Sequence, residues 1–186
     1  MASLSVELTG STSLVTLDLD CNMFGVEGLR NVVPFLRNCP QLKTLYLGEN
    51  ENINTDCFEV LVSALDGKSV EEMHFFYCNV EDISALGTYN LPNLKTLNLT
   101  NNNIGMEGIR ILSNKLQQVG STLKELILTS TGIDDEGTEL LATSLKHNTT
   151  LEALYLEGMG NNITERGCNA ILKLMVDVSS IDSTYN

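Results

Sequence analysis

Residues 94–108 read LKTLNLTNNNIGMEG, and the spacing of their leucines decides the fold. The stretch fits the template Leu-x-x-Leu-x-Leu-x-x-Asn, whose last two leucines, two residues apart, are typical of a short strand with one buried face. The template recurs along the whole chain. Its second apolar position returns every 24 to 29 residues, at Leu17, Leu45, Met73, Leu97, Leu126, Leu154 and Ile181.

A repeat of this length predicts a solenoid. One short strand cannot bury its apolar face alone, so neighbouring copies must stack with their strands parallel. Apolar residues at helical spacing follow the strands, as in 26–36 and 109–116, which predicts a helix in each crossover. We therefore expect an α/β horseshoe arc of six and a half repeats, with a parallel sheet on its concave face and helices on its convex face.

The repeats divide a single domain of residues 1–186 into three parts. Residues 1–13 are expected to form an N-terminal strand and partial cap, 14–177 six repeats, and 178–186 a truncated seventh repeat. The third repeat has 24 residues, which leaves room for one turn of 3₁₀ helix. In the sixth repeat an insertion displaces the template asparagine, and we expect Asn161 to replace it. Because solenoid ends need caps, the truncated end predicts either a fragment of a longer array or end-to-end association.

The chain resembles the leucine-rich repeat family. Its 28-residue period and the stretch from Asn102 to Gly108 are similar to the ribonuclease-inhibitor-like subclass, as in the repeat domains of NOD-like receptors and in Ran GTPase-activating protein. The resemblance covers residues 14–186. It implies the horseshoe fold and leaves the function open, because one fold serves many functions.

Composition excludes several classes of partner. The 186 residues include 24 acidic and 11 basic ones, which gives a net charge of −13. This charge argues against nucleic acid and against an anionic membrane surface, and it favours a basic partner. We see no signal peptide and no apolar stretch long enough to span a bilayer. The five widely spaced cysteines suit a reducing compartment, so we expect a cytoplasmic protein.

No enzymatic or cofactor chemistry is indicated. The two histidines do not combine with a serine or cysteine into a nucleophilic arrangement, and no phosphate-binding loop is present. His74 and Cys78 are too few ligands for zinc, and surface carboxylates such as Asp18 and Asp20 are usually solvated. We expect a protein that is not an enzyme and that holds no cofactor and no metal.

The candidate functional residues lie between the leucines, where strand side chains face the concave surface. Seven of these 28 positions are acidic and none is Lys or Arg. Aromatic residues on adjacent strands are the usual anchors of a protein interface, and neighbouring carboxylates suit a partner with a basic surface. We expect the partner-binding residues to be Asp18, Asp20, Tyr46, Glu49, Glu72, His74, Phe76, Tyr77 and Tyr155.

Three functions stay open. The first is a non-catalytic protein-interaction module that binds a partner on this acidic and aromatic face. The second, implied by the resemblance, is a regulator of a small GTPase, although Arg110 and Arg166 lie inside or near helices, away from the expected rim. The third is the sensing repeat domain of a NOD-like receptor. The aromatic residues have a structural interpretation too, as a minor cluster tilted by the short third repeat.

Overall fold

Strands and helices alternate regularly along the chain. The structure is a computed structural model that describes residues 13–181, with the backbone alone for 175–181. Its elements are β1 (Thr16–Asp18), α2 (Val26–Arg37), β2 (Thr44–Tyr46), α3 (Thr55–Ala64), β3 (Glu72–His74), α4 (Ala85–Thr88), β4 (Thr96–Asn98), α5 (Gly105–Gln117), β5 (Glu125–Ile127), α6 (Asp135–Leu145), β6 (Ala153–Tyr155) and α7 (Glu165–Ile181).

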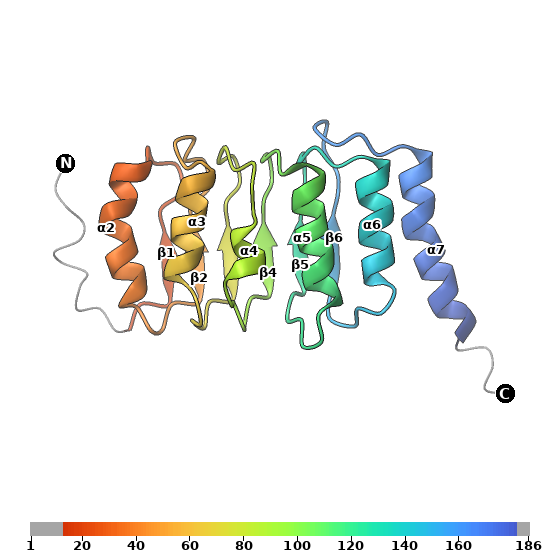
Figure 1. Cartoon of the computed structure of the whole chain (residues 1–186), viewed down its shortest axis with the longest axis horizontal. Helices are drawn as coiled ribbons and strands as arrows, with labels where there is room; N and C mark the ends of the chain where they lie inside the picture. The colour runs from red at the N-terminus through yellow and green to blue at the C-terminus, as the bar shows by residue number, and fades with distance from the viewer. Residues whose placement is uncertain (1–12, 182–186) are drawn as a thin grey trace.

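The six strands form one parallel sheet in chain order, β1 to β6. The register pairs Leu17 with Leu45 and Leu126 with Leu154, so equivalent template positions stand side by side. Figure 1 shows the helices in a single layer over one face of this sheet. The predicted α/β leucine-rich repeat solenoid is confirmed. We number repeats 1 to 6 from their first template positions, which are residues 14, 42, 70, 94, 123 and 151.

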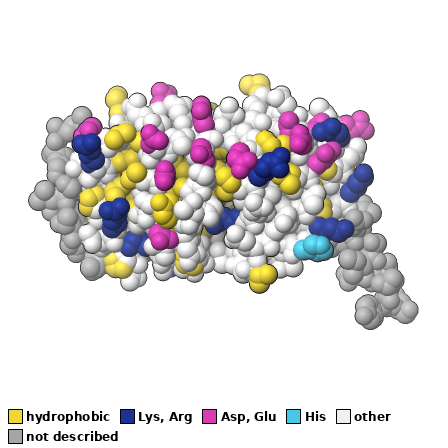
Figure 2. All heavy atoms as spheres, in the orientation of Figure 1, with side chains coloured by type: hydrophobic (Ala, Val, Ile, Leu, Met, Phe, Trp, Pro, Cys, Tyr) yellow, Lys and Arg dark blue, Asp and Glu magenta, His cyan; other side chains and the backbone are white. Residues whose placement is uncertain are grey.

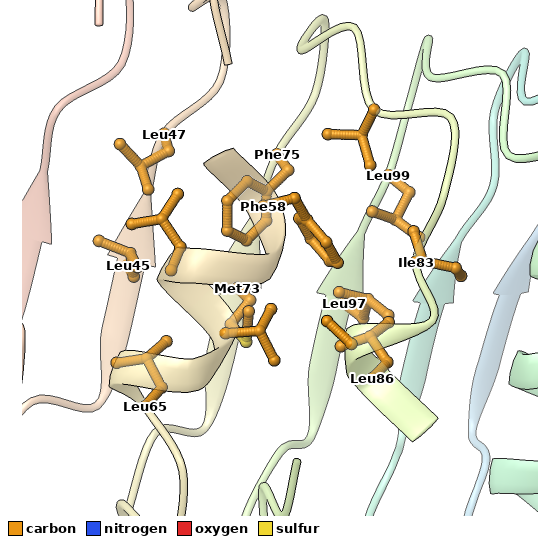
Figure 3. Packing of buried hydrophobic residues seen from close by; sticks show 14 of the residues in the cluster. Leu45, Leu47, Phe58, Leu65, Met73, Phe75, Ile83, Leu86, Leu97 and Leu99 are labelled. Atoms are coloured by element: carbon orange, nitrogen blue, oxygen red, sulfur yellow. The ribbon is translucent and has the colours of Figure 1, made fainter. Parts of the chain in front are cut away.

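The core lies between the sheet and the helices. The side chains of Leu45, Leu97 and Leu126 are fully buried there. In the middle of the molecule Phe58 of α3 meets Phe75 edge to face, with ring centroids 5.0 Å apart, and both rings are fully buried (Figure 3). Because this core is continuous across the repeats, the stability of each repeat depends on its neighbours.

Buried asparagines close the turn that follows several strands. The Asn102 side-chain amide donates to the backbone carbonyls of Phe75, Leu99 and Thr100, at 2.6 to 3.2 Å. In repeat 6 the equivalent bonds come from Asn161, which donates to two leucine carbonyls. The expected replacement of the template asparagine by Asn161 is therefore confirmed.

The short third repeat has a single helical turn, α4, as expected. The turn is α-helical and not 3₁₀, which corrects the prediction. The long side chain of Lys115 reaches back from α5 and donates to the Leu86 carbonyl of α4 at 3.0 Å. Burial lowers the pKa of the Lys115 ammonium. A side chain from repeat 4 thus satisfies a backbone group that a longer helix would have paired.

The C-terminal end of the described chain differs from the expectation. Helix α7 continues through Ile181, so residues 178–181 are helical and do not begin a seventh strand. The reason is visible in the sequence, because Ile171, Leu174, Val178 and Ile181 recur every three or four residues, which is the period of a helix. Residues 182–186 and the expected N-terminal strand within 1–12 lie outside the described residues. None of the described helices is long and apolar enough to cross a bilayer.

Candidate functional site

The candidate site lies on the helix-free face of the sheet, which we call the concave face. The register places Asp18, Tyr46 and His74 side by side on β1, β2 and β3. Backbone hydrogen bonds extend the pairing past the strand ends, since Glu49 donates from its N–H to the Phe76 carbonyl. Eight of the nine predicted residues come from repeats 1 to 3, so the fold brings them together. We call them the aromatic–acidic cluster: Asp18, Asp20, Tyr46, Glu49, Glu72, His74, Phe76 and Tyr77.

Tyr46 and His74 form the centre of this cluster. Their rings stack with centroids 4.5 Å apart and an interplanar angle of 21°. Burial lowers the pKa of His74 against the opposing charges of Glu72 and Asp20, so the imidazole is neutral at physiological pH. The pair therefore forms one compact unit in which the two ring faces cover each other.

Phe76 rests on a glycine of the neighbouring repeat. A Cβ atom built on Gly48 would come within 2.4 Å of two carbons of the Phe76 ring, so the ring occupies the volume of the missing side chain. Phe76 is consequently half-buried, and it meets Tyr77 edge to face at 6.5 Å. The ring faces the concave side, as predicted, but it packs on the backbone at Gly48 instead of standing free.

Tyr77 holds an unusual backbone conformation. Its φ of 54° is left-handed, and the same turn position is left-handed in four other repeats, at Cys21, Glu49, Asn101 and Ser130. This conformation costs a non-glycine residue roughly 1 kcal/mol, and a bulky ring suits it poorly. The Tyr77 side chain is 55% exposed. The ring therefore contributes exposed surface at a position where the fold would prefer Gly or Asn.

The carboxylates of the cluster are not neutralised by any described Lys or Arg side chain. Burial raises the pKa of Asp20, and the nearby charges of Asp18 and Glu49 add to the effect. The Asp20 carboxylate accepts the Gly48 N–H at 2.6 Å, and Glu49 accepts from the Cys21 thiol at 3.3 Å. Among the described residues, no Lys or Arg forms an ion pair with any carboxylate of the cluster. A cationic partner group would meet uncompensated negative charge.

The ninth predicted residue, Tyr155, lies apart from the others. It shares a row with His74, but β4 and β5 separate the two, which is a distance of about 14 Å at the usual spacing of strands. Its side chain is exposed. The residues between them are the half-buried Asn98 and Ile127, which the sequence did not single out.

Sequence reasoning also missed a ladder of charges at the opposite end of the strands. Lys43 and Lys95 both pair with Glu71, at 2.9 and 2.5 Å, and Lys124 pairs with Glu152 at 2.5 Å. These residues all follow the first leucine position of their repeats, so the repeat alignment contained the signal. The Lys95 and Lys43 ammonium groups lower the pKa of Glu71.

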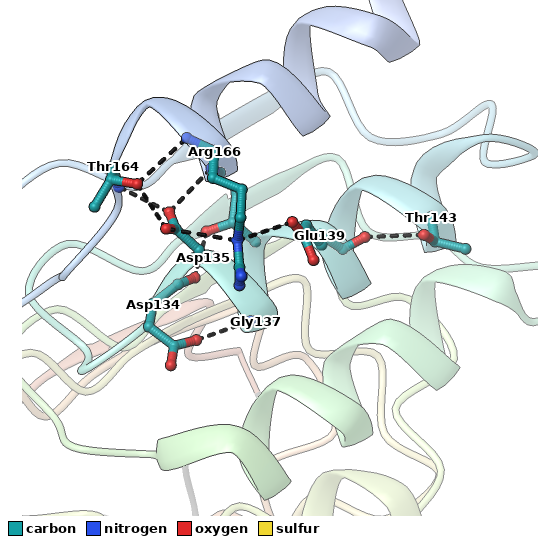
Figure 4. A network of polar contacts seen from close by, with 9 residues as sticks. Asp134, Asp135, Gly137, Glu139, Thr143, Thr164 and Arg166 are labelled. Atoms are coloured by element: carbon teal, nitrogen blue, oxygen red, sulfur yellow. Dashed lines mark hydrogen bonds and ion pairs between the residues drawn. The ribbon is translucent and has the colours of Figure 1, made fainter.

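The two arginines relevant to a GTPase regulator are held on the helical side. Arg110 pairs with Glu107, and Arg166 lies 3.1 Å from Glu139 and 3.7 Å from Asp135 (Figure 4).

No group of three His, Cys, Asp or Glu side chains suited to a metal ion occurs among residues 13–174.

A family model and a relative agree with the repeat pattern. A family model described as Leucine Rich repeat matches residues 10–33, 90–113 and 121–142. A human protein, NACHT, LRR and PYD domains-containing protein 5, is 28% identical over 160 residues. The match covers 81% of this chain and 13% of that protein. A solved structure of the Leiomodin-1 Actin-Binding Site 2 is 15% identical, with a TM-score of 0.43 over 92% of this chain and 87% of the other.

Proposed function

We propose that this chain of leucine-rich repeats is a non-catalytic module that binds a protein with a basic surface through the aromatic–acidic cluster. One observation carries the proposal. Two rings stacked at 4.5 Å and a third ring seated on Gly48 adjoin four carboxylates that pair with no Lys or Arg among the described residues. Aromatic rings supply contact area, and uncompensated carboxylates favour a cationic partner.

The cluster suits binding because it is ordered in advance. The Tyr46–His74 stack and the Gly48 seat of Phe76 both limit side-chain motion, which reduces the entropy lost on association. A Lys or Arg side chain of the partner that lies over the exposed Tyr77 ring would gain a cation–π contact as well as the nearby charges. Surface complementarity then provides the binding, with no chemical step.

The test begins by selecting phage-displayed peptides on the intact protein. We expect selected peptides to be enriched in Arg and Lys. Binding of a selected synthetic peptide should weaken at least about tenfold in the double variant Tyr46→Ala, Tyr77→Asn, because truncated hot-spot residues cost on the order of 1 to 2 kcal/mol each. Asn tolerates the left-handed backbone at position 77, so the fold is preserved.

Tyr155→Ala is the matched control, because it removes an exposed ring of the same face outside the cluster. Its affinity should stay close to that of the unchanged protein. Equal losses in both variants, or a library that yields no basic peptides, would rule out the cluster as the binding site. Thermal melts of each variant separate loss of binding from loss of fold.

A second candidate function is favoured by the human relative, whose name states NACHT and PYD domains beside the repeats. This chain would then be part of the sensing repeats of a larger NOD-like receptor, acting in the cytoplasm. Sequencing of the full transcript tests the idea, because it requires a NACHT-coding segment. A regulator of a small GTPase has less support, since Arg110 and Arg166 are both held in ion pairs.

We also propose self-association through the last repeat. Leu154 and Leu156 of repeat 6 are half-buried, whereas the equivalent Leu126 and Leu128 are fully buried. A second copy packed on β6 would complete the burial and pair the outer edge of β6, which no described strand covers. Light scattering over a range of concentrations should show dimers that Leu154→Lys abolishes, and a monomer at all concentrations would contradict the proposal.

A further inference from the structure

A groove runs between α6 and α7 on the helical side of the molecule, away from the aromatic–acidic cluster. Its volume is about 540 Å³. Apolar side chains, three basic residues and one acidic residue contribute to its lining: Ala142, Ala170, Leu174, Lys146, Arg166, Lys173 and Glu139. Figure 2 shows Lys and Arg side chains over this end of the molecule, with Asp and Glu side chains among them. Three of the eleven basic residues of an acidic chain thus share one groove.

Arg166 is fixed in place before any ligand arrives. The Asp135 carboxylate accepts from the backbone N–H groups of Thr164 and Gly167, at 2.7 and 2.9 Å, so a residue of α6 caps the start of α7 (Figure 4). The same carboxylate and Glu139 hold the Arg166 guanidinium. These contacts set the spacing of the two helices that form the groove walls.

The two lysines differ from Arg166, because no described carboxylate forms an ion pair with either ammonium group. Lys146 and Lys173 are both exposed, and neither takes part in an ion pair between described residues. Lys146 follows the last turn of α6, where a cation is favoured by the helix dipole. Two available ammonium groups therefore flank a partly apolar groove.

We propose that this groove binds an acidic segment of a partner protein, with carboxylates on Lys146 and Lys173 and a small apolar side chain on Ala142, Ala170 and Leu174. Charge complementarity selects the occupant, since basic segments would be repelled here. A nucleic acid is disfavoured, because it needs many phosphate contacts and this chain carries a net charge of −13. The apolar lining fits a peptide better than a phosphate backbone.

This surface is independent of the proposed function, since it lies on the other side of the sheet and has the opposite charge. A protein with both surfaces could hold a basic and an acidic partner at the same time. The experiment measures fluorescence anisotropy of a labelled short peptide of alternating Glu and Leu, titrated with the full chain at low salt. Labelled oligothymidine of similar length is titrated in parallel.

We expect the peptide to bind the unchanged protein and to bind the double variant Lys146→Gln, Lys173→Gln at least about fivefold more weakly, as for the loss of two charged contacts. The matched control is Arg30→Gln, Arg110→Gln, which removes the same charge from exposed helix positions outside the groove. The control should bind the peptide like the unchanged protein.

Three results would overturn the proposal. They are a peptide that does not bind the unchanged protein, equal weakening in the groove variant and the control, and oligothymidine that binds as tightly as the peptide. The variants replace exposed side chains and keep Arg166, so a folding defect is not expected, and thermal melts verify it. Chemical-shift changes at the Ala142 and Ala170 methyl groups locate the bound peptide independently.

Discussion

Successive repeats are joined in two different ways. Repeats 1 and 2, 3 and 4, and 5 and 6 are joined by the side chains of Asn50, Asn102 and Asn161. Each amide donates to a carbonyl of the preceding repeat, and its oxygen accepts a backbone N–H of that same repeat. Each amide also donates to a carbonyl of its own repeat, so one side chain satisfies backbone groups on both sides of the junction.

The two junctions between them lack this amide. Cys78 donates its thiol to the Leu47 carbonyl of repeat 2, and the Thr131 hydroxyl donates to the Leu128 carbonyl of its own repeat. At the first of these junctions the largest buried rings, Phe58 and Phe75, pack against each other. At this junction an apolar ring pair and a weaker thiol hydrogen bond stand where the other junctions have the amide, while the strand ladder continues through all six repeats.

The largest effect is expected for Asn102→Ala, which removes the amide that joins repeats 3 and 4. The variant leaves the Phe75 carbonyl and the Val80 N–H buried without their side-chain partner. We expect a loss of about 3 kcal/mol in the free energy of unfolding, because each unsatisfied buried group costs about 1 to 3 kcal/mol. Urea denaturation measures it, with the exposed Asn114→Ala as control. A loss no larger than the control's would mean that the amide does not join these repeats.

Cys78→Asn is the reverse test, because it introduces the amide at the junction of repeats 2 and 3, where it is missing. An asparagine there would reach the Leu47 carbonyl, as the thiol does, and would add an acceptor for a backbone N–H of repeat 2. We expect a gain of about 1 kcal/mol in the free energy of unfolding, since one net hydrogen bond contributes about that much. Burial raises the pKa of the Cys78 thiol to about 11, so no charge is lost at neutral pH. A lower melting temperature would show that the site is too tightly packed for an amide.

The smallest effect is expected for the pH dependence of stability at the junction of repeats 5 and 6. Hydrogen bonds from Thr164 lower the pKa of Asp135 in the folded protein below its ordinary value of about 3.9. The ionised carboxylate therefore stabilises the fold at higher pH, and this contribution is lost as the pH falls through the folded pKa. Asp135→Asn should melt at a lower temperature than the unchanged protein at neutral pH. The difference should shrink in acid, and a constant difference would contradict the assignment.

Much of the fold could be predicted from sequence because its determinants are periodic. The leucine positions specify strand register directly, and the position of Asn161 follows from the same template. The helical identity of 178–181 was missed, because short apolar runs fit strand and helix alike. The repeat alignment also placed eight of the nine predicted residues in adjacent repeats, whereas Tyr155 lies apart from them.

The details of the site depended on contacts that no repeat pattern encodes. The seat of Phe76 requires a glycine at position 48 of the neighbouring repeat, and the stack of Tyr46 on His74 depends on rotamers. The groove beside Lys146 depends on how far α7 stands from α6, which Asp135 sets by capping the second helix. Such features arise from side chains that are distant in sequence, so they appear only in three dimensions.

The absence of a side chain at Gly48 gives the concave face an adjustable part. A single methyl group at that position would occupy the place of the Phe76 ring and push it outward, toward solvent. Neither residue occupies a template leucine position of the core, so the packing of the stacked repeats would be little affected. One small substitution could therefore remodel the recognition surface while the scaffold is kept, which is how a repeat protein can diversify its targets without rebuilding its fold.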